Sequence, residues 1–202
     1  MIRSILKTAL PNRIVQIIHD LGRVESGARG TYLRLVWGRR RVQRAPADAL
    51  SRQGTVVVIC HGNILRSAFA EALLKRAVST HRAPGLCVSS AGLHAVPGKS
   101  ADPRGVEVAR EWGVDLTAHH ATALTAEAVA AADLLLVMDY QNAAEVLWRH
   151  PDAADKVVLL GNFDPAWATD PVIPDPYGGD LEEVRSSYGR VAAAVEGLVA
   201  AP

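Results

Sequence analysis

The sequence predicts an α/β fold, a four-stranded parallel sheet flanked by helices on both faces, preceded by a basic helical N-terminal extension. Two observations support this fold class. Short apolar runs, often β-branched, alternate along the chain with longer helical segments. The apolar runs also lack the polar alternation of a strand that faces water, as is typical of strands buried on both sides of a parallel sheet. Strands that alternate with helices favour such a sheet.

The expected elements follow in chain order. The run Thr-Val-Val-Val-Ile predicts the first strand, and three more apolar runs predict the others; the four strands are 55–59, 86–89, 134–138 and 156–160. Segments rich in helix formers predict five helices at 67–78, 102–112, 125–132, 142–148 and 181–199. Gly113 is placed to end the second helix as a C-terminal cap. The last segment is amphipathic and closes the domain.

Composition limits the class of protein. Hydrophobic residues make up 49% and charged residues 21% of the 202 residues, which is typical of a folded globular chain and not of a disordered one. Cys60 and Cys87 are too few for a disulfide framework, so a reducing compartment is expected. No stretch approaches the roughly 20 apolar residues that cross a bilayer, and the N-terminus lacks the continuous apolar core of a signal peptide. We therefore expect a cytoplasmic protein.

Charge divides the chain in two. Residues 1–52 hold eleven Lys or Arg and three Asp or Glu, whereas residues 53–202 hold eleven and eighteen. This asymmetry predicts a basic N-terminal extension, 1–52, and a separate domain, 53–202. Within the extension, residues 2–21 place Ile and Leu at helical spacing.

Three interpretations of the extension stay open. It could be a basic amphipathic segment that contacts an anionic membrane surface, at the inner face of the membrane. It could be a docking arm for a protein partner or for self-association, or a solvated, weakly ordered extension. No nucleic-acid recognition motif accompanies the basic charge, so no nucleic acid is expected as a partner.

The loop after the first strand, residues 60–67, is the strongest candidate site. In parallel α/β folds, ligands bind beyond the carboxyl ends of the strands. The loop reads Cys-His-Gly-Asn-Ile-Leu-Arg-Ser and leads into a helix. A tight loop of this kind turns successive backbone N–H groups inward, and the helix N-terminus adds positive potential, which together make an anion site. The sequence therefore predicts a phosphate loop between the first strand and the first helix.

The side chains of this loop suggest nucleophilic chemistry at phosphorus. Arg66 could grip two phosphate oxygens, while the surrounding donors would stabilise the thiolate of Cys60 for attack. Gly62 and Asn63 suit left-handed backbone turns. Ser67 could donate its hydroxyl to the sulfur and assist its departure from a thiophosphate.

A structural interpretation of the same residues has to be weighed. A Cys and an Arg six residues apart occur by chance, and a buried Cys after a strand is commonly a packing residue. The flanking strand, the Gly-Asn pair, the Ser after Arg66 and the following helix favour the phosphate loop.

Residues 58–67, Val-Ile-Cys-His-Gly-Asn-Ile-Leu-Arg-Ser, resemble the signature of the low-molecular-weight protein tyrosine phosphatases. Further segments follow in family order: Ser-Ser-Ala-Gly-Leu at 89–93, Val-Pro-Gly-Lys-Ser-Ala-Asp-Pro at 96–103, Val-Met-Asp at 137–139 and Ile-Pro-Asp-Pro-Tyr at 173–177. The resemblance covers roughly residues 55–200. It implies a four-stranded parallel sheet and hydrolysis of phosphotyrosine through a phosphocysteine, without cofactor or metal. The segments Ala-Gly-Leu and Gly-Lys-x-Ala-Asp look most like the bacterial branch that acts on membrane-bound tyrosine autokinases of capsule and exopolysaccharide export.

The resemblance assigns the general acid to Asp175, which would protonate the leaving tyrosine and then activate water. The same Pro-Asp-Pro-Tyr-Gly-Gly segment is also strong turn chemistry, and both interpretations are compatible. Tyr177 is expected to wall an aromatic slot, with Ile64 and His61 on the loop side. Related protein-arginine phosphatases carry Thr at position 64, so Ile64 favours phosphotyrosine.

The resemblance also implies supporting residues and departures. Asn63 and Ser90 are expected to pair and hold the loop, although Ser90 could be a plain strand-end hydroxyl. His119 matches a structural histidine of the family, and His120 is expected to be exposed. Leu65 stands where many members carry a second Cys beside the nucleophile, and Ala68 stands where Pro is usual, which costs some rigidity at the first helical turn. Cys87 is interpreted as a core residue.

Two other functions compete. Arsenate reductase uses the same scaffold, but its thiol cascade needs further cysteines near residues 132–139, and none is present. A phosphate-binding scaffold protein without catalysis is the third hypothesis. The joint presence of Cys60, Arg66 and Asp175 argues against it.

Overall fold

The structure, a computed structural model, describes residues 54–80, 85–167 and 170–200. Within them lies one sheet with the strand order β2-β1-β3-β4, in which each neighbouring pair is parallel. The strands are β1 (Gly54–Cys60), β2 (Leu86–Gly92), β3 (Leu134–Val137) and β4 (Val157–Leu159). The predicted four-stranded parallel sheet is confirmed. β1 lies inside the sheet, and Cys60 is its last residue, at the carboxyl end.

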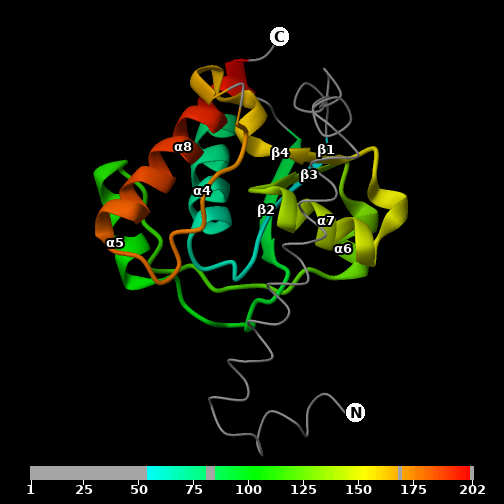
Figure 1. The fold of residues 1–202 in the computed structure, drawn as a ribbon, viewed down its shortest axis with the longest axis horizontal. Helices are drawn as coiled ribbons and strands as arrows, with labels where there is room; N and C mark the ends of the chain where they lie inside the picture. Colours follow the sequence, from blue (N-terminus) through cyan, green and yellow to red (C-terminus); the bar gives the residue numbers. More distant parts are fainter. Residues whose placement is uncertain (1–53, 81–84, 168–169, 201–202) are drawn as a thin grey trace, which may run out of the picture.

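Helices cover both faces of the sheet, as predicted (Figure 1). One face packs on α4 (Arg66–Thr80), α5 (Pro103–Glu111) and α8 (Leu181–Ala200), and the other on α6 (Ala126–Ala131) and α7 (Tyr140–Arg149). The strand β1 serves both cores, because its residues are buried on alternating sides: Val56 and Val58 belong to one cluster, Val57 and Ile59 to the other. The aromatic rings of Phe69 on α4 and Tyr188 on α8 stack at 3.9 Å and join these two helices.

Local signals explain where the helices begin and end. Asp102, Thr125 and Asp139 cap α5, α6 and α7 by accepting a hydrogen bond from a backbone N–H of the first turn. Gly113 follows α5 with φ +67°, the left-handed conformation expected of its C-terminal cap. The five helices match the predicted segments within two residues at each end.

The strand β2 is longer than predicted, because Ser90, Ala91 and Gly92 continue the pairing with Val58–Cys60. Small and polar residues are weak strand formers, so the sequence alone placed the end of this strand too early. Three short 3-10 helices were not predicted: η1 (Pro151–Ala153), η2 (Leu160–Phe163) and η3 (Pro165–Trp167), of which η2 begins at Leu160, the predicted last residue of the fourth strand. They complete the connections around β4 and do not alter the sheet.

The prediction that Cys87 is a core residue is wrong, because its side chain is exposed. β2 is an edge strand, and near its start Leu86 and Val88 face the core while Cys87 points to the opposite side. The predicted extension, residues 1–52, lies outside the described residues. Within the described segments, no helix combines the length and apolar character needed to span a membrane.

Candidate active site

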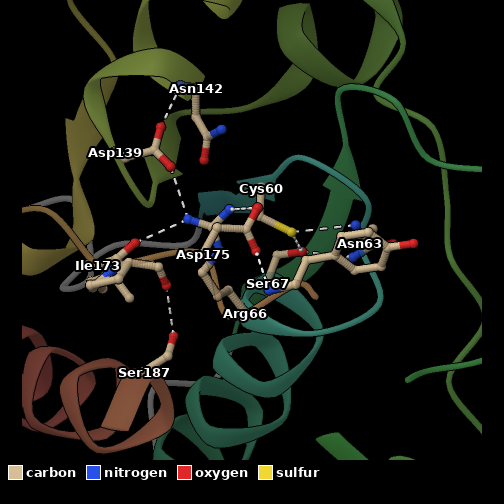
Figure 2. Close-up of polar contacts among 11 residues, drawn as sticks. Cys60, Asn63, Arg66, Ser67, Asp139, Asn142, Ile173, Asp175 and Ser187 are labelled. Carbon is tan, nitrogen blue, oxygen red and sulfur yellow. Dashed lines mark hydrogen bonds and ion pairs between the residues drawn. The ribbon is translucent and has the colours of Figure 1, made fainter. Parts of the chain in front are cut away.

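The predicted phosphate loop connects the end of β1 to the start of α4 and encloses a buried sulfur (Figure 2). The Sγ atom of Cys60 lies 3.0 Å from the hydroxyl of Ser67 and accepts a hydrogen bond of 3.3 Å from the backbone N–H of Asn63. Two polar groups therefore converge on the sulfur from the loop and from the first turn of α4. Donors in this arrangement stabilise a thiolate more than a thiol.

Asn63 organises the loop from within. It is fully buried and adopts φ +53°, the left-handed conformation that Asn tolerates better than most residues. Its side-chain amide donates to Ser67 Oγ at 2.9 Å and to Ser90 Oγ at 2.8 Å, and its carbonyl oxygen Oδ1 accepts from the Thr122 N–H at 2.8 Å. The Nε2 atom of His119 lies 2.8 Å from the Asn63 backbone oxygen. Each polar atom of this side chain thus has a partner.

Two glycines at the phosphate loop, Gly62 and Gly92, differ from the sequence prediction. The left-handed conformation occurs at Asn63 and not at Gly62, so the prediction for Gly62 is wrong; the loop reverses with a single such residue. Gly92, at the end of β2, was missed. A Cβ atom there would lie 2.9 Å from both the Asn63 N and the Gly62 carbonyl carbon. β2 can approach the loop this closely only because Gly92 has no side chain.

Arg66 is buried, and its positive charge is paired with two carboxylates. Its Nη1 atom donates to Asp139 Oδ2 at 2.8 Å and to the Ile173 carbonyl at 3.0 Å, and its Nη2 atom pairs with Asp175 Oδ2 at 2.8 Å. Burial disfavours the charged guanidinium, but the negative charges of Asp175, Asp139 and Cys60 offset this and raise the pKa of Arg66. The Nε atom is buried without a partner. A phosphoryl oxygen is the kind of acceptor that this remaining donor fits.

Sequence reasoning missed the role of Asp139. This residue follows β3, caps α7 by accepting from the Asn142 N–H at 2.7 Å, and binds Arg66 with its other oxygen. The signal was available in the Val-Met-Asp segment, because an acid at the carboxyl end of a central parallel strand lies near the loop at the end of the neighbouring strand. Glu71 of α4 was also missed; it accepts a hydrogen bond from Ser90 Oγ behind the loop.

Asp175 and Tyr177 lie on the loop that precedes α8. Asp175 Oδ1 accepts from the Tyr177 N–H at 3.2 Å, so the segment forms the expected turn while Oδ2 reaches Arg66. Hydrogen bonds to both sides of the chain fix the loop just upstream of Asp175: the Ile173 N–H donates to the Met138 carbonyl at 2.9 Å, and Ser187 Oγ of α8 donates to the Pro174 carbonyl at 3.0 Å. Asp175 therefore lines the same pocket as Cys60, although the two residues are more than a hundred positions apart in the chain.

A pocket of about 130 Å³ opens above the sulfur. It is lined by the predicted residues Cys60, His61, Gly62, Ile64, Leu65, Arg66, Asp175 and Tyr177. Asn63, Ser67 and Ser90 do not line it and instead hold the loop from behind. His94, Val96 and Lys99 also line the pocket and were not predicted. Among the described residues, no group of three His, Cys, Asp or Glu side chains is placed to bind a metal ion.

Comparisons with known proteins agree with this geometry. Residues 55–201 match the family model of the low molecular weight phosphotyrosine protein phosphatases. EpsP of Ralstonia nicotianae, named a probable low molecular weight protein-tyrosine-phosphatase, is 42% identical over 148 residues, which are 72% of this chain and 93% of EpsP.

Two solved structures show the same fold. The crystal structure of the tyrosine phosphatase AmsI of Erwinia amylovora has 35% identity and a TM-score of 0.66, covering 73% of this chain and 92% of AmsI. The YwlE arginine phosphatase of Geobacillus stearothermophilus has 30% identity and a TM-score of 0.64, covering 72% and 90%. The chain therefore belongs to the low molecular weight phosphotyrosine protein phosphatase family.

Proposed function

We propose that this protein hydrolyses phosphotyrosine in protein substrates through a phosphocysteine at Cys60. The observation that carries the proposal is the meeting of three groups in one pocket: the buried sulfur of Cys60, the guanidinium of Arg66 with an open Nε, and the carboxyl of Asp175. A nucleophile, an anion clamp and an acid are the parts that phosphoryl transfer to sulfur requires.

In the first step, the Cys60 thiolate attacks phosphorus and the bond from phosphorus to the tyrosine oxygen breaks. Asp175, protonated once it has left its ion pair with Arg66, gives its proton to that oxygen, so that neutral tyrosine leaves. The phosphoryl oxygens accept hydrogen bonds from two Arg66 atoms: Nη2, which pairs with Asp175 in the structure, and the unpaired Nε. Asp175 is then displaced toward the leaving oxygen, where its proton is needed.

In the second step, Asp175 accepts a proton from water while the water oxygen attacks phosphorus. The phosphorus–sulfur bond breaks, inorganic phosphate forms, and Cys60 returns as a thiolate. The hydroxyl of Ser67, 3.0 Å from the sulfur, stabilises the departing thiolate by donating a hydrogen bond.

A kinetic profile on phosphotyrosine, phosphoserine and phosphoarginine peptides tests the substrate class. We expect turnover of the phosphotyrosine peptide without added metal, inhibition by vanadate, and loss of turnover in Cys60→Ser with substrate binding retained. Unchanged turnover in Cys60→Ser would end the proposal. Tight phosphate binding without turnover in the wild-type protein would favour the scaffold hypothesis instead.

Phosphoarginine is the second candidate substrate, because one of the structural relatives is named an arginine phosphatase. The side chain of Ile64 lines the pocket and is itself buried. An apolar residue at this wall favours a flat aromatic ring over a polar guanidinium group. We expect Ile64→Thr to raise the ratio of phosphoarginine to phosphotyrosine turnover, and Ile64→Val, which keeps the wall apolar, to leave it unchanged.

Arsenate reduction is disfavoured by the position of the second cysteine. Cys87 pairs with Thr55 in the sheet, whereas Cys60 pairs with Gly92. Five residues of strand separate the two levels, about 16 Å, and a disulfide needs Cα atoms within about 7 Å. Cys87 therefore does not reach the nucleophile, and we expect no thiol-dependent arsenate reduction by the purified protein.

The biological substrate that we propose is a membrane-bound tyrosine autokinase of capsule or exopolysaccharide export. The support is the bacterial character of the Ala-Gly-Leu and Gly-Lys-x-Ala-Asp segments. The basic residues 1–52 would bring the phosphatase domain, 53–202, to the cytoplasmic inner face of the membrane. Co-sedimentation with vesicles containing anionic lipid tests this second part: full-length protein is expected in the pellet, and a protein that begins at Gln53 in the supernatant. Equal partitioning of the two would refute it.

A further inference from the structure

Two stacked imidazole rings stand at the mouth of the active-site pocket. His61 is the first residue after the nucleophile, and His94 follows the end of β2. Their ring centroids lie 4.5 Å apart with an angle of 25° between the planes, and both residues line the pocket. The backbones are joined as well, because the His94 N–H donates to the His61 carbonyl at 2.8 Å. The two rings therefore behave as one unit at the first turn of the phosphate loop.

This ring pair is held from behind by α7. Glu145 Oε1 lies 2.7 Å from Nε2 of His94. The same carboxylate also pairs with Arg149, one helical turn further on. Arg149 in turn donates through Nη1 to the Leu93 carbonyl at 3.0 Å, directly beside His94. Both the side chain and the backbone at this position are thus fixed to one helix.

The negative charge of Glu145 affects the histidine that it contacts. Burial disfavours its ionised form, but the hydrogen bond with His94 and the positive charges of His94, Arg149 and His61 lower the pKa of Glu145 overall. An ionised carboxylate favours positive charge on an imidazole that it contacts. The rings lie between this carboxylate and a pocket whose other charged lining residues are Arg66, Lys99 and Asp175.

We propose that His94 is a substrate-positioning residue: held by Glu145, it fixes the ring of His61 and keeps positive charge at the pocket mouth for the incoming phosphoryl dianion. This inference rests on the proposed phosphatase function of the same pocket. A phosphate monoester carries a charge of about −1.5 to −2 at neutral pH, and cationic groups that line a cleft concentrate such anions. A charge that attracts the phosphoryl group equally before and during the reaction strengthens substrate binding and leaves the chemical step unchanged.

Steady-state kinetics on a phosphotyrosine peptide, with the full-length protein and at two pH values, test the proposal. His94→Phe keeps an aromatic ring to stack on His61 but removes the charge and the contact with Glu145. Glu145→Gln keeps a hydrogen-bonding group but removes the negative charge. His94→Ala removes the stack as well. Glu182→Gln, an equal change in an exposed ion pair on α8, is the matched control.

At about pH 6, where imidazoles carry a proton, His94→Phe and Glu145→Gln are expected to raise KM by about 3-fold to 10-fold with kcat nearly unchanged. The increase should be smaller at about pH 8 than at about pH 6, because proton loss from an imidazole removes the charge that the variants lack. His94→Ala should raise KM further and lower kcat, because His61 loses its stacking partner. Glu182→Gln should match the wild type at both pH values. Because all variants are compared on one substrate, the effect of pH on the ionisation of the substrate phosphate is the same for each of them.

A wild-type KM in His94→Phe at both pH values would overturn the inference, and so would a fall in kcat with KM unchanged. Failure of the proposed function gives a different result, namely no turnover by the wild-type protein. Calorimetric titration with inorganic phosphate then decides the inference alone, because it needs no turnover. Weaker phosphate binding by His94→Phe at about pH 6 supports the positioning role, and equal binding contradicts it.

Discussion

The phosphate loop and the acid loop, residues 170–180, both bring residues to the active-site pocket, but the protein holds them in very different ways. In the phosphate loop, Asn63, Arg66 and Ser67 are buried and hydrogen-bonded to one another or to neighbouring elements. In the acid loop, the side chain of Asp175 is 27% exposed and Tyr177 is 54% exposed. The acid loop is fixed by its backbone on either side of these two residues, at Ile173 and Pro174 upstream and at Gly179 downstream.

This difference follows the chemistry of each part. A thiolate and its anion clamp must be in place before the substrate arrives, because an oriented site avoids reorganisation in the transition state. In the proposed mechanism, Asp175 has to leave Arg66 and follow the leaving oxygen, so an exposed side chain on an anchored loop suits it. The phosphate loop is thus built for fixed geometry and the acid loop for a short movement.

The largest expected effect comes from the fixed loop. Arg66→Lys removes the planar fork and the open Nε while keeping a positive charge. We expect kcat/KM on a phosphotyrosine peptide to fall by about 10³-fold, because a lysine cannot hold phosphate, Asp139 and the Ile173 carbonyl together. Arg185→Lys, in an ion pair with Glu111 outside the pocket, serves as the control. A loss below tenfold would show that charge alone, and not the fork, binds the phosphate.

A change in the acid loop should depend on the leaving group. Asp175→Asn is expected to lower kcat on phosphotyrosine by about 10²-fold, because the leaving oxygen no longer receives a proton. With p-nitrophenyl phosphate, whose leaving group needs less help, the loss should be smaller. Parallel rate measurements on the two substrates decide the point. Equal losses on both would mean that Asp175 acts only through its ion pair with Arg66.

Asn63 allows strain to be separated from hydrogen bonding. Asn63→Ala removes three side-chain hydrogen bonds and leaves alanine in the left-handed conformation, at φ +53°, which its Cβ atom disfavours. The free energy of unfolding should therefore fall by about 2–4 kcal/mol. Asn63→Gly loses the same bonds without the strain and should be more stable than the Ala variant by about 1 kcal/mol. Urea unfolding measures both. Equal stability of the two variants would contradict a strained backbone at this position.

The smallest effect is expected at the anchor of the acid loop. Ser187→Ala leaves the Pro174 carbonyl without its donor and should cost about 1 kcal/mol of stability. The loss of kcat should be greater on phosphotyrosine than on p-nitrophenyl phosphate, because only the acid loses its position. Ser186→Ala, at the exposed neighbouring site, is the matched control. A kcat loss of the same size on both substrates would show that the anchor serves the whole pocket.

The parts that could be predicted from the sequence are those whose cause is local. The run Thr55–Ile59 is apolar throughout, and β1 is buried as its pattern requires. Cys60, Arg66 and Ser67 lie within one loop of eight residues, so they could be placed together without knowledge of the fold. Gly113 ended α5 for the same local reason.

The parts that were missed or wrong depend on contacts between distant segments. Asp139 could have been placed near the loop by its position at the end of a predicted strand, but no local spacing shows that Glu145 pairs with the distant His94. Cys87 was assigned to the core because the sequence does not show that β2 lies at the edge of the sheet. Gly92 is needed only because a separate loop passes within contact distance.

The direction of β1 has a consequence for how the protein works when it is bound to something larger. The strand begins at Gly54, whereas Cys60, the proposed nucleophile, stands at the other end of the same strand, seven residues long. At about 3.3 Å per residue, the two points are about 20 Å apart. A partner that contacts the sheet at the Gly54 end therefore meets the side remote from Cys60 and leaves the pocket accessible to a phosphorylated side chain.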